Sequence, residues 1–168
     1  MPITIRKAVA DDVPTMLAIM DSAVVWLNAR GITAQWGTEP FSASPKLVEG
    51  FHRYVAECSP WIAEIDGVPA GTMTLAPVPG AHVPPAGEPE VFVRSLATEG
   101  RHHGRGVGSA LLAHAVEETR RQGVSLLRVD CFAGGEGRLV RCYERNGFTP
   151  TETFAIDDWP GQVLARRV

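Results

Sequence analysis

The sequence is poor in cysteine and has no long apolar run, and these two absences exclude several classes of protein. Its 168 residues include three cysteines, Cys58, Cys131 and Cys142, which are widely spaced and form no CxxC pair. This pattern argues against a disulfide framework or a zinc site, so we expect reduced thiols and no metal. No stretch approaches the roughly 20 apolar residues of a membrane span. The start, MPITIRKAV, lacks the apolar core of a signal peptide. We therefore expect a soluble cytoplasmic protein that does not bind membranes.

A strong excess of charge of either sign is also missing. The formal net charge is -3 and the sequence pI is about 5.9, which gives no reason to expect a nucleic-acid partner. The composition is 45% hydrophobic and 21% charged, as in ordinary globular proteins. The length suits one domain with a substantial core, so we expect residues 1–168 to form a single domain.

Helical and strand patterns alternate along the chain, which predicts an α/β fold. The Asp66-Gly67 pair predicts a hairpin turn, and the proline- and glycine-rich stretch 78–90 predicts an exposed loop. Helices are expected near 13–30, 44–58, 107–122 and 138–145, and strands near 3–8, on both sides of the hairpin turn, and near 90–98, 124–132, 148–154 and 162–168.

The densest glycine cluster lies between a predicted strand and a predicted helix. Gly104, Gly106 and Gly108 alternate with other residues there, and His103 and Arg105 add cationic side chains. A glycine-rich helix N-terminus presents unpaired N–H groups that attract phosphates. A Walker A loop would need Gly-Lys-Ser/Thr, and a dinucleotide fingerprint would need glycine where Ser109 stands. Taken alone, the cluster predicts either a phosphate-binding turn or a plain glycine-rich turn.

Two motifs decide in favour of the phosphate. The run from His103 to Gly108, followed by SALL, resembles the (Arg/Gln)-x-x-Gly-x-(Gly/Ala) pyrophosphate loop of the GNAT superfamily of acyl-CoA-dependent N-acyltransferases. CYERNGF, at 142–148, resembles the Tyr-x-x-x-Gly-Phe signature of the same family, and the order of elements agrees over nearly the whole chain. The chain departs from the family by having His103 where Arg or Gln is usual, and AGGEG (133–137) lacks an asparagine that many relatives have.

The resemblance implies an α/β (α+β) fold: a mixed, mainly antiparallel twisted sheet with helices on both faces. It also implies that the sheet splays between the strand at 90–98 and the strand at 124–132. Acetyl-CoA is the implied co-substrate. Its pyrophosphate would lie on the 103–109 turn, and its pantetheine and carbonyl on backbone groups of the first of these strands. The implied coenzyme-binding residues are Leu96, Ala97, Thr98, His103, Gly104, Arg105, Gly106, Val107, Gly108, Ser109 and Tyr143.

The resemblance also assigns chemical roles. Tyr143 matches the family tyrosine that protonates, or hydrogen-bonds to, the departing sulfur, with a tyrosine packed in the core as the alternative. Glu90 is the candidate general base, with a solvated loop-end charge as the alternative and Glu88 as a nearby competitor. Trp26 and Trp36 are candidates for the wall of the acceptor pocket, although Trp26 also fits a plain core position.

The function implied is transfer of an acetyl group to a primary amine by direct attack in a ternary complex. The acceptor is a small-molecule or peptide amine, and a homodimer is compatible with the family. The alternative from another class is a non-catalytic acyl-CoA-binding sensor of the same fold, which would bind the coenzyme without releasing thiol. A nucleotide-binding protein is a third candidate, for which ATP or NAD would outcompete CoA.

Overall fold

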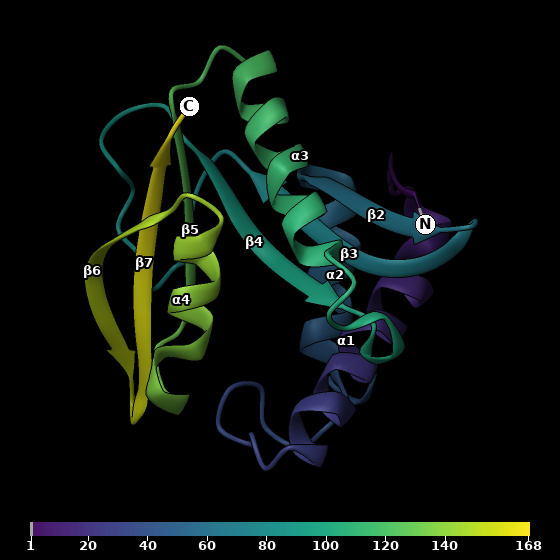
Figure 1. Cartoon of the computed structure of the whole chain (residues 1–168). Coiled ribbons are helices and arrows are strands. Elements are labelled where there is room, and N and C mark those ends of the chain that lie inside the picture. The colour runs from purple at the N-terminus through teal and green to yellow at the C-terminus, as the bar shows by residue number, and fades with distance from the viewer. Residues whose placement is uncertain (1) are drawn as a thin grey trace. The chain divides into compact units, whose positions relative to one another are not determined.

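A computed structural model describes residues 2–168, and seven strands and four α-helices follow one another in this range (Figure 1). The elements are β1 (Ile3–Lys7), α1 (Val13–Ala29), α2 (Pro45–Glu57), β2 (Ser59–Ile65), β3 (Val68–Ala76), β4 (Val91–Thr98), α3 (Val107–Arg121), β5 (Leu126–Phe132), α4 (Arg138–Arg145), β6 (Thr149–Ile156) and β7 (Trp159–Arg167).

The strands are hydrogen-bonded in the order β1-β2-β3-β4-β5-β7-β6. The β1–β2, β5–β7 and β6–β7 pairs are antiparallel, and β4 and β5 are parallel. The parallel ladder joins Val91–Val93 to Leu127–Val129. The predicted fold class, a mixed and mainly antiparallel sheet with helices on both faces, is confirmed. The splay beyond this ladder stays a prediction.

The chain forms two compact units, and both β3 and β4 contribute residues to each. The first contains Met1–Thr74 and Ser95–Leu111, and the second contains Leu75–Arg94 and Leu112–Val168. That these units make up a single domain stays a prediction.

In the first unit, local signals account for the helix starts and the hairpin. Pro45 begins α2, and the Ser44 hydroxyl accepts a hydrogen bond from Leu47 N at 3.2 Å, as an N-cap residue does. The predicted turn between β2 and β3 is confirmed, because Asp66 and Gly67 both have positive φ, 52° and 77°, as a type I′ turn requires.

Close packing at Gly71 fixes the beginning of α3 against β3. A Cβ on Gly71 would lie 2.6 Å from Val107 Cγ1 and 3.1 Å from Ala97 O. Only glycine therefore fits at this point of β3. The first turn of α3 and the end of β4 are held together there, next to the glycine cluster of the sequence.

In the second unit, the short helix α4 follows β5 and ends with Asn146 as its C-cap, followed by Gly147. Gly147 has φ +88°, and the N–H groups of Asn146 and Phe148 both donate to Tyr143 O, at 2.9 and 3.1 Å. The chain thus reverses directly after the residue that the family signature singles out.

Candidate active site

The glycine turn, residues 103–109, has the backbone of an anion cradle. Gly104 and Gly106 lie in the left-handed region, with φ of +84° and +81°, and a Cβ on either would meet no atom within 4 Å. Ala110 N donates to Gly106 O at 2.9 Å, so the N–H groups of Val107, Gly108 and Ser109 precede the hydrogen-bond ladder of α3. These groups and the open space beside the glycines fit a pyrophosphate.

Gly108 differs from the other two glycines of this turn. It lies inside the first turn of α3 without a positive φ. A Cβ there would have Thr98 Oγ1 as its nearest neighbour, at 3.8 Å. Left-handed geometry is therefore a requirement at Gly104 and Gly106 only. At Gly108 the protein itself leaves room for a side chain.

Helix α1 anchors the residues that lead into the glycine turn. Gly100 N donates to Ser22 Oγ at 2.8 Å, and the Ser22 hydroxyl donates to Glu99 Oε1 at 2.7 Å. A Cβ on Gly100 would lie 3.3 Å from the Cβ of Trp26. Burial opposes ionisation of Glu99, but hydrogen bonds from Ser22 and Arg101 outweigh it and hold the pKa of this carboxyl below its usual value.

Trp26, a predicted acceptor residue, contacts His103, a predicted coenzyme residue. Their rings stack with centroids 3.7 Å apart and planes inclined by 22°. The guanidinium carbon of Arg30 lies 3.8 Å from the Trp26 ring centre. Two flat groups this close to one ring centre would overlap on the same face, so they cover opposite faces of the indole. Trp26 therefore supports the first residue of the glycine turn.

Trp36 belongs to a different aromatic group. Its ring meets Phe41 edge to face at 5.6 Å, and Phe41 in turn meets Phe51 at 6.4 Å. Phe51 of α2 is buried in the core together with residues of α1. The acceptor-binding roles of Trp36 and Trp26 stay predictions, and the two side chains have different surroundings.

The end of β4 contributes Leu96, Ala97 and Thr98. Ala97 is buried in the core with residues of α1, and Thr98 Oγ1 lies beside Gly108. Glu99 N donates to Ala70 O at 2.8 Å, which ties the end of this strand to β3. The predicted contacts of these backbone groups with pantetheine stay predictions.

Tyr143 lies in the second unit and is almost completely buried, with 7% of its surface exposed. Its ring packs edge to face on Phe148 at 5.8 Å. Burial raises the pKa of the phenol far above its usual value, and the Cys131 and Cys142 thiols and the Asp130 carboxylate add to this rise. Tyr143 therefore keeps its proton at every ordinary pH and can act as a donor.

Glu90 is engaged in a buried ion pair with Arg128. Its carboxylate accepts from Arg128 Nε at 2.8 Å and Nη2 at 3.1 Å, and from Ala86 N at 2.9 Å. The two side chains are only 3% and 6% exposed. Arg128 also donates to Pro84 O at 2.9 Å. The base role of Glu90 stays a prediction, but its contacts are those of a structural anchor.

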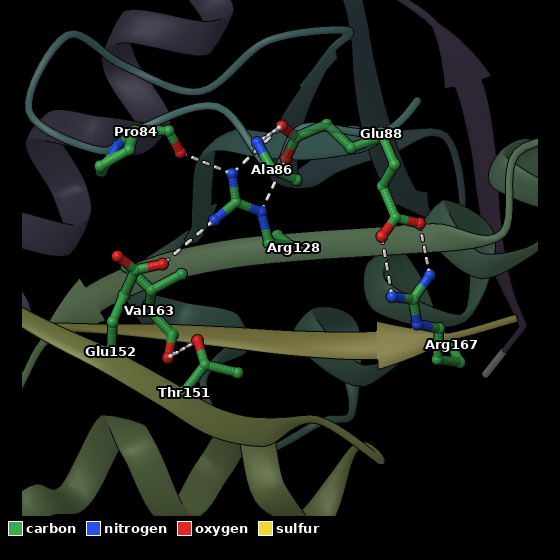
Figure 2. Close-up of polar contacts among 9 residues, drawn as sticks. Pro84, Ala86, Glu88, Arg128, Thr151, Glu152, Val163 and Arg167 are labelled. Atoms are coloured by element: carbon green, nitrogen blue, oxygen red, sulfur yellow. Dashed lines mark hydrogen bonds and ion pairs between the residues drawn. The ribbon is translucent and has the colours of Figure 1, made fainter.

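Glu88, the competing carboxylate, is also paired. Arg167 donates to it through both terminal nitrogens, at 2.6 and 2.9 Å (Figure 2). The pair is exposed, and the hydrogen bonds from Arg167 lower the pKa of Glu88. Neither candidate carboxylate is therefore poised to accept a proton without losing a salt bridge.

Several polar residues of these surroundings were missed by sequence reasoning: Ser22, His82, Arg128 and Asp130. His82 Nε2 lies 3.0 Å from Asp130 Oδ2. A signal did exist for two of them, because Arg128 and Asp130 interrupt the apolar strand LLRVDCF at alternate positions. A charged residue in such a strand is usually paired. Their partners, however, come from a loop some 40 residues earlier.

Within residues 2–168, no three His, Cys, Asp or Glu side chains are grouped as metal ligands would be. No helix in the same range combines the length and apolar character needed to cross a bilayer.

Comparison with known proteins assigns this arrangement to a family. The model of the acetyltransferase (GNAT) family matches residues 21–148. Among solved structures, PaiA N-acetyltransferase from Thermoplasma acidophilum in complex with coenzyme A is similar, with 16% identity, full coverage of both chains and a TM-score of 0.72. Ribosomal-protein-alanine N-acetyltransferase from Brucella melitensis is 22% identical, with 98% and 99% of the two chains covered and a TM-score of 0.69.

A third similar structure is that of YncA from Salmonella typhimurium with its cofactor acetyl-CoA. It is 20% identical, with 98% of this chain and 93% of that chain covered and a TM-score of 0.67. At these identities the structural matches establish the fold, and the family model establishes the membership.

Proposed function

Because the chain belongs to the acetyltransferase (GNAT) family, we propose that it transfers an acetyl group from acetyl-CoA to a primary amine by direct attack in a ternary complex. The observation that carries this proposal is the glycine turn. Its left-handed glycines, the open space beside them and the N-terminus of α3 fit a pyrophosphate. Solved structures of the same fold contain coenzyme A or acetyl-CoA.

Residues of this chain would hold acetyl-CoA by its pyrophosphate and by the amides of its pantetheine arm. The N–H groups of Val107, Gly108 and Ser109 would bind the pyrophosphate, with Arg105 supplying positive charge and the His103 ring beside it. Backbone groups of residues 96–98 would hold the pantetheine amides. When bound, acetyl-CoA supplies the thioester carbonyl that the amine attacks.

Tyr143 would donate its phenolic proton to the sulfur as the carbon–sulfur bond breaks. Its buried, neutral phenol suits this role, because the raised pKa keeps the proton in place until a strong base forms beside it. A donor of this kind contributes most in the transition state, where the negative charge on sulfur develops.

The acceptor is proposed only as a class, a small-molecule or peptide amine. One similar structure is named for an alanine residue of a ribosomal protein, so a peptide that begins with alanine belongs in any substrate panel. Trp36 and its aromatic neighbours remain our candidates for part of the acceptor pocket. Trp26 fits the coenzyme side better, because it supports His103.

Two measurements test the proposal. Acetyl-CoA should bind in calorimetry and raise the melting temperature, whereas ATP and NAD should do neither. Thiol release from acetyl-CoA should then be detected with at least one member of a panel of diamines, amino-acid amides and alanine-initiated peptides. Absence of CoA binding at millimolar concentration would refute the proposal. Tight binding without thiol release on the whole panel would favour the sensor.

A further inference from the structure

We propose that His82, oriented by Asp130, is the general base that takes the proton from the acceptor amine. This inference rests on the acetyl transfer proposed above and concerns residues of the second unit only. An alkylamine is mostly protonated at neutral pH, so direct attack needs a group that accepts its proton.

The geometry of the pair is that of an oriented imidazole. His82 Nε2 lies 3.0 Å from Asp130 Oδ2. Because a carboxylate can only accept, Nε2 carries the hydrogen in the neutral imidazole, and the lone pair is then on Nδ1. The His82 side chain is 38% exposed and that of Asp130 is 18% exposed, so an amine from solution can reach the imidazole.

Packing holds the ring of His82 in this orientation. Phe154 of β6 lies 5.0 Å from it, between ring centroids. A Cβ on Gly80 would come within 3.1 Å of His82 Cε1 and 3.4 Å of Nδ1. Asp130 is the charged group paired with the ring, and Arg94 Nε lies 3.9 Å from the same Cβ position on Gly80. The Phe154 ring and the backbone at Gly80 thus both pack closely against the imidazole.

Two arginines fix the loop that carries His82, residues 77–90. Figure 2 shows Arg128 of β5 reaching the carbonyl of Pro84 and a carboxylate beside Ala86, and Arg167 of β7 pairing with Glu88. Together with the His82–Asp130 pair, these contacts attach the loop to β5 and β7 at successive points. In this arrangement Glu90 holds the loop in place through Arg128, and His82 is the group that accepts the proton of the amine.

The position of Asp130 along β5 also suits a base. The parallel ladder between β4 and β5 ends at the Val93–Val129 pair, and Asp130 is the next residue. Side chains alternate along a strand, so Asp130 and Cys131 lie on opposite faces of β5. Asp130 therefore lies just past the end of the β4–β5 ladder, on the opposite face of β5 from Cys131.

The proton and electron balance of the reaction is complete with these two groups. His82 Nδ1 takes one proton from the ammonium group, and the lone pair of the neutral amine forms the carbon–nitrogen bond. The carbon–sulfur bond then breaks, its electron pair stays on sulfur, and Tyr143 protonates the sulfur. The second proton of the nitrogen restores Tyr143. The products are an amide, a thiol and one proton, which His82 releases to solvent.

The test compares His82→Gln and Asp130→Asn with the unaltered protein. The probe is whichever of 1,4-diaminobutane, glycinamide or an alanine-initiated pentapeptide gives the fastest thiol release. We expect His82→Gln to lower kcat at pH 7 by about 100-fold, with a rate that keeps rising towards the pKa of the amine. Asp130→Asn should lower kcat by about tenfold. Added imidazole should partly restore a His82→Ala variant.

Matched measurements separate a chemical role from a structural one. His52→Gln, on an exposed position of α2, should leave the pH profile unchanged. The Kd for CoA and the melting temperature of His82→Gln should also stay close to their original values. If His82→Gln is folded and keeps the original pH–rate profile, this inference is wrong. If the unaltered protein binds no CoA, the proposed function fails first.

Discussion

Alanine at Gly106 and alanine at Gly108 should have opposite effects on folding and the same effect on coenzyme binding. The two residues are separated only by Val107 and belong to the same turn. Gly106 has φ +81°, whereas Gly108 lies inside the first turn of α3 without a positive φ. The pair therefore provides a matched test of how the glycine turn works.

The expected magnitudes follow from backbone conformation, because neither alanine meets a steric clash. At Gly106 no atom lies within 4 Å of the added Cβ, so the cost is that of a left-handed alanine, about 1–2 kcal/mol. At Gly108 the nearest atom is Thr98 Oγ1 at 3.8 Å, an ordinary contact. Alanine in a helix is favoured over glycine by up to about 1 kcal/mol. The two variants should thus differ in unfolding free energy by about 2 kcal/mol.

Urea unfolding and calorimetry with CoA measure the two effects separately. Gly106→Ala should unfold at lower urea concentration than the unaltered protein, and Gly108→Ala at equal or higher concentration. Both should bind CoA at least about tenfold more weakly, which corresponds to about 1.4 kcal/mol, because the new Cβ occupies space meant for the pyrophosphate. A Gly108→Ala variant that is stable and binds CoA with undiminished affinity would show that the turn is purely structural.

Three other predictions concern the second unit. Tyr143→Phe should lower kcat by about 100-fold or more while the Kd for CoA changes little, as single-turnover kinetics and calorimetry can measure. Glu90→Gln removes the buried counter-charge of Arg128 and leaves it paired with the exposed Glu152, 3.6 Å from Arg128 Nη1; this should cost about 3–5 kcal/mol of stability in urea unfolding. Burial raises the pKa of Cys131 to about 12 and that of Tyr143 further. The native state therefore keeps protons that the unfolded chain releases, so stability should fall as pH rises from about 8.5 through about 12. Alkaline melting curves check this.

Local sequence signals were sufficient to predict the tight turns and the position of the tyrosine signature. The left-handed residues at Asp66-Gly67 and at Gly106 follow from a conformation that few residues other than glycine adopt readily. The Tyr143 signature is read within seven residues, 142–148. The family resemblance then supplied the mixed, mainly antiparallel character of the sheet, which no local signal contains. These features could be predicted because each depends on residues close together in the chain or on a known fold.

The contacts of Glu90 could not be predicted in the same way. Its position at the start of β4 indicated a base, but its partner Arg128 lies 38 residues further along, on β5. The pairing depends on the parallel register of these strands, Val91 opposite Leu127 and Phe92 opposite Arg128. Only the fold brings this arginine next to Pro84 and Glu90. Glu90 lies near the position expected of a base, but its ion pair with Arg128 holds the 77–90 loop in place.

The contacts of helix α1 with residues far along the chain also could not be predicted from the sequence. Ser22 and Trp26 are four residues apart, so they share one face of α1, and Arg30 follows directly after the end of this helix. The Ser22 hydroxyl accepts a hydrogen bond from Gly100 N. The Trp26 ring lies between the His103 ring and the Arg30 guanidinium. The family resemblance made Trp26 a candidate for the acceptor pocket or a plain core residue, and nothing in the sequence indicated a contact with His103, 77 residues further along the chain. Through these contacts, this face of α1 positions the glycine turn. The stacked indole restrains the histidine that stands where the family usually has arginine or glutamine, and it is a favourable neighbour for a cation.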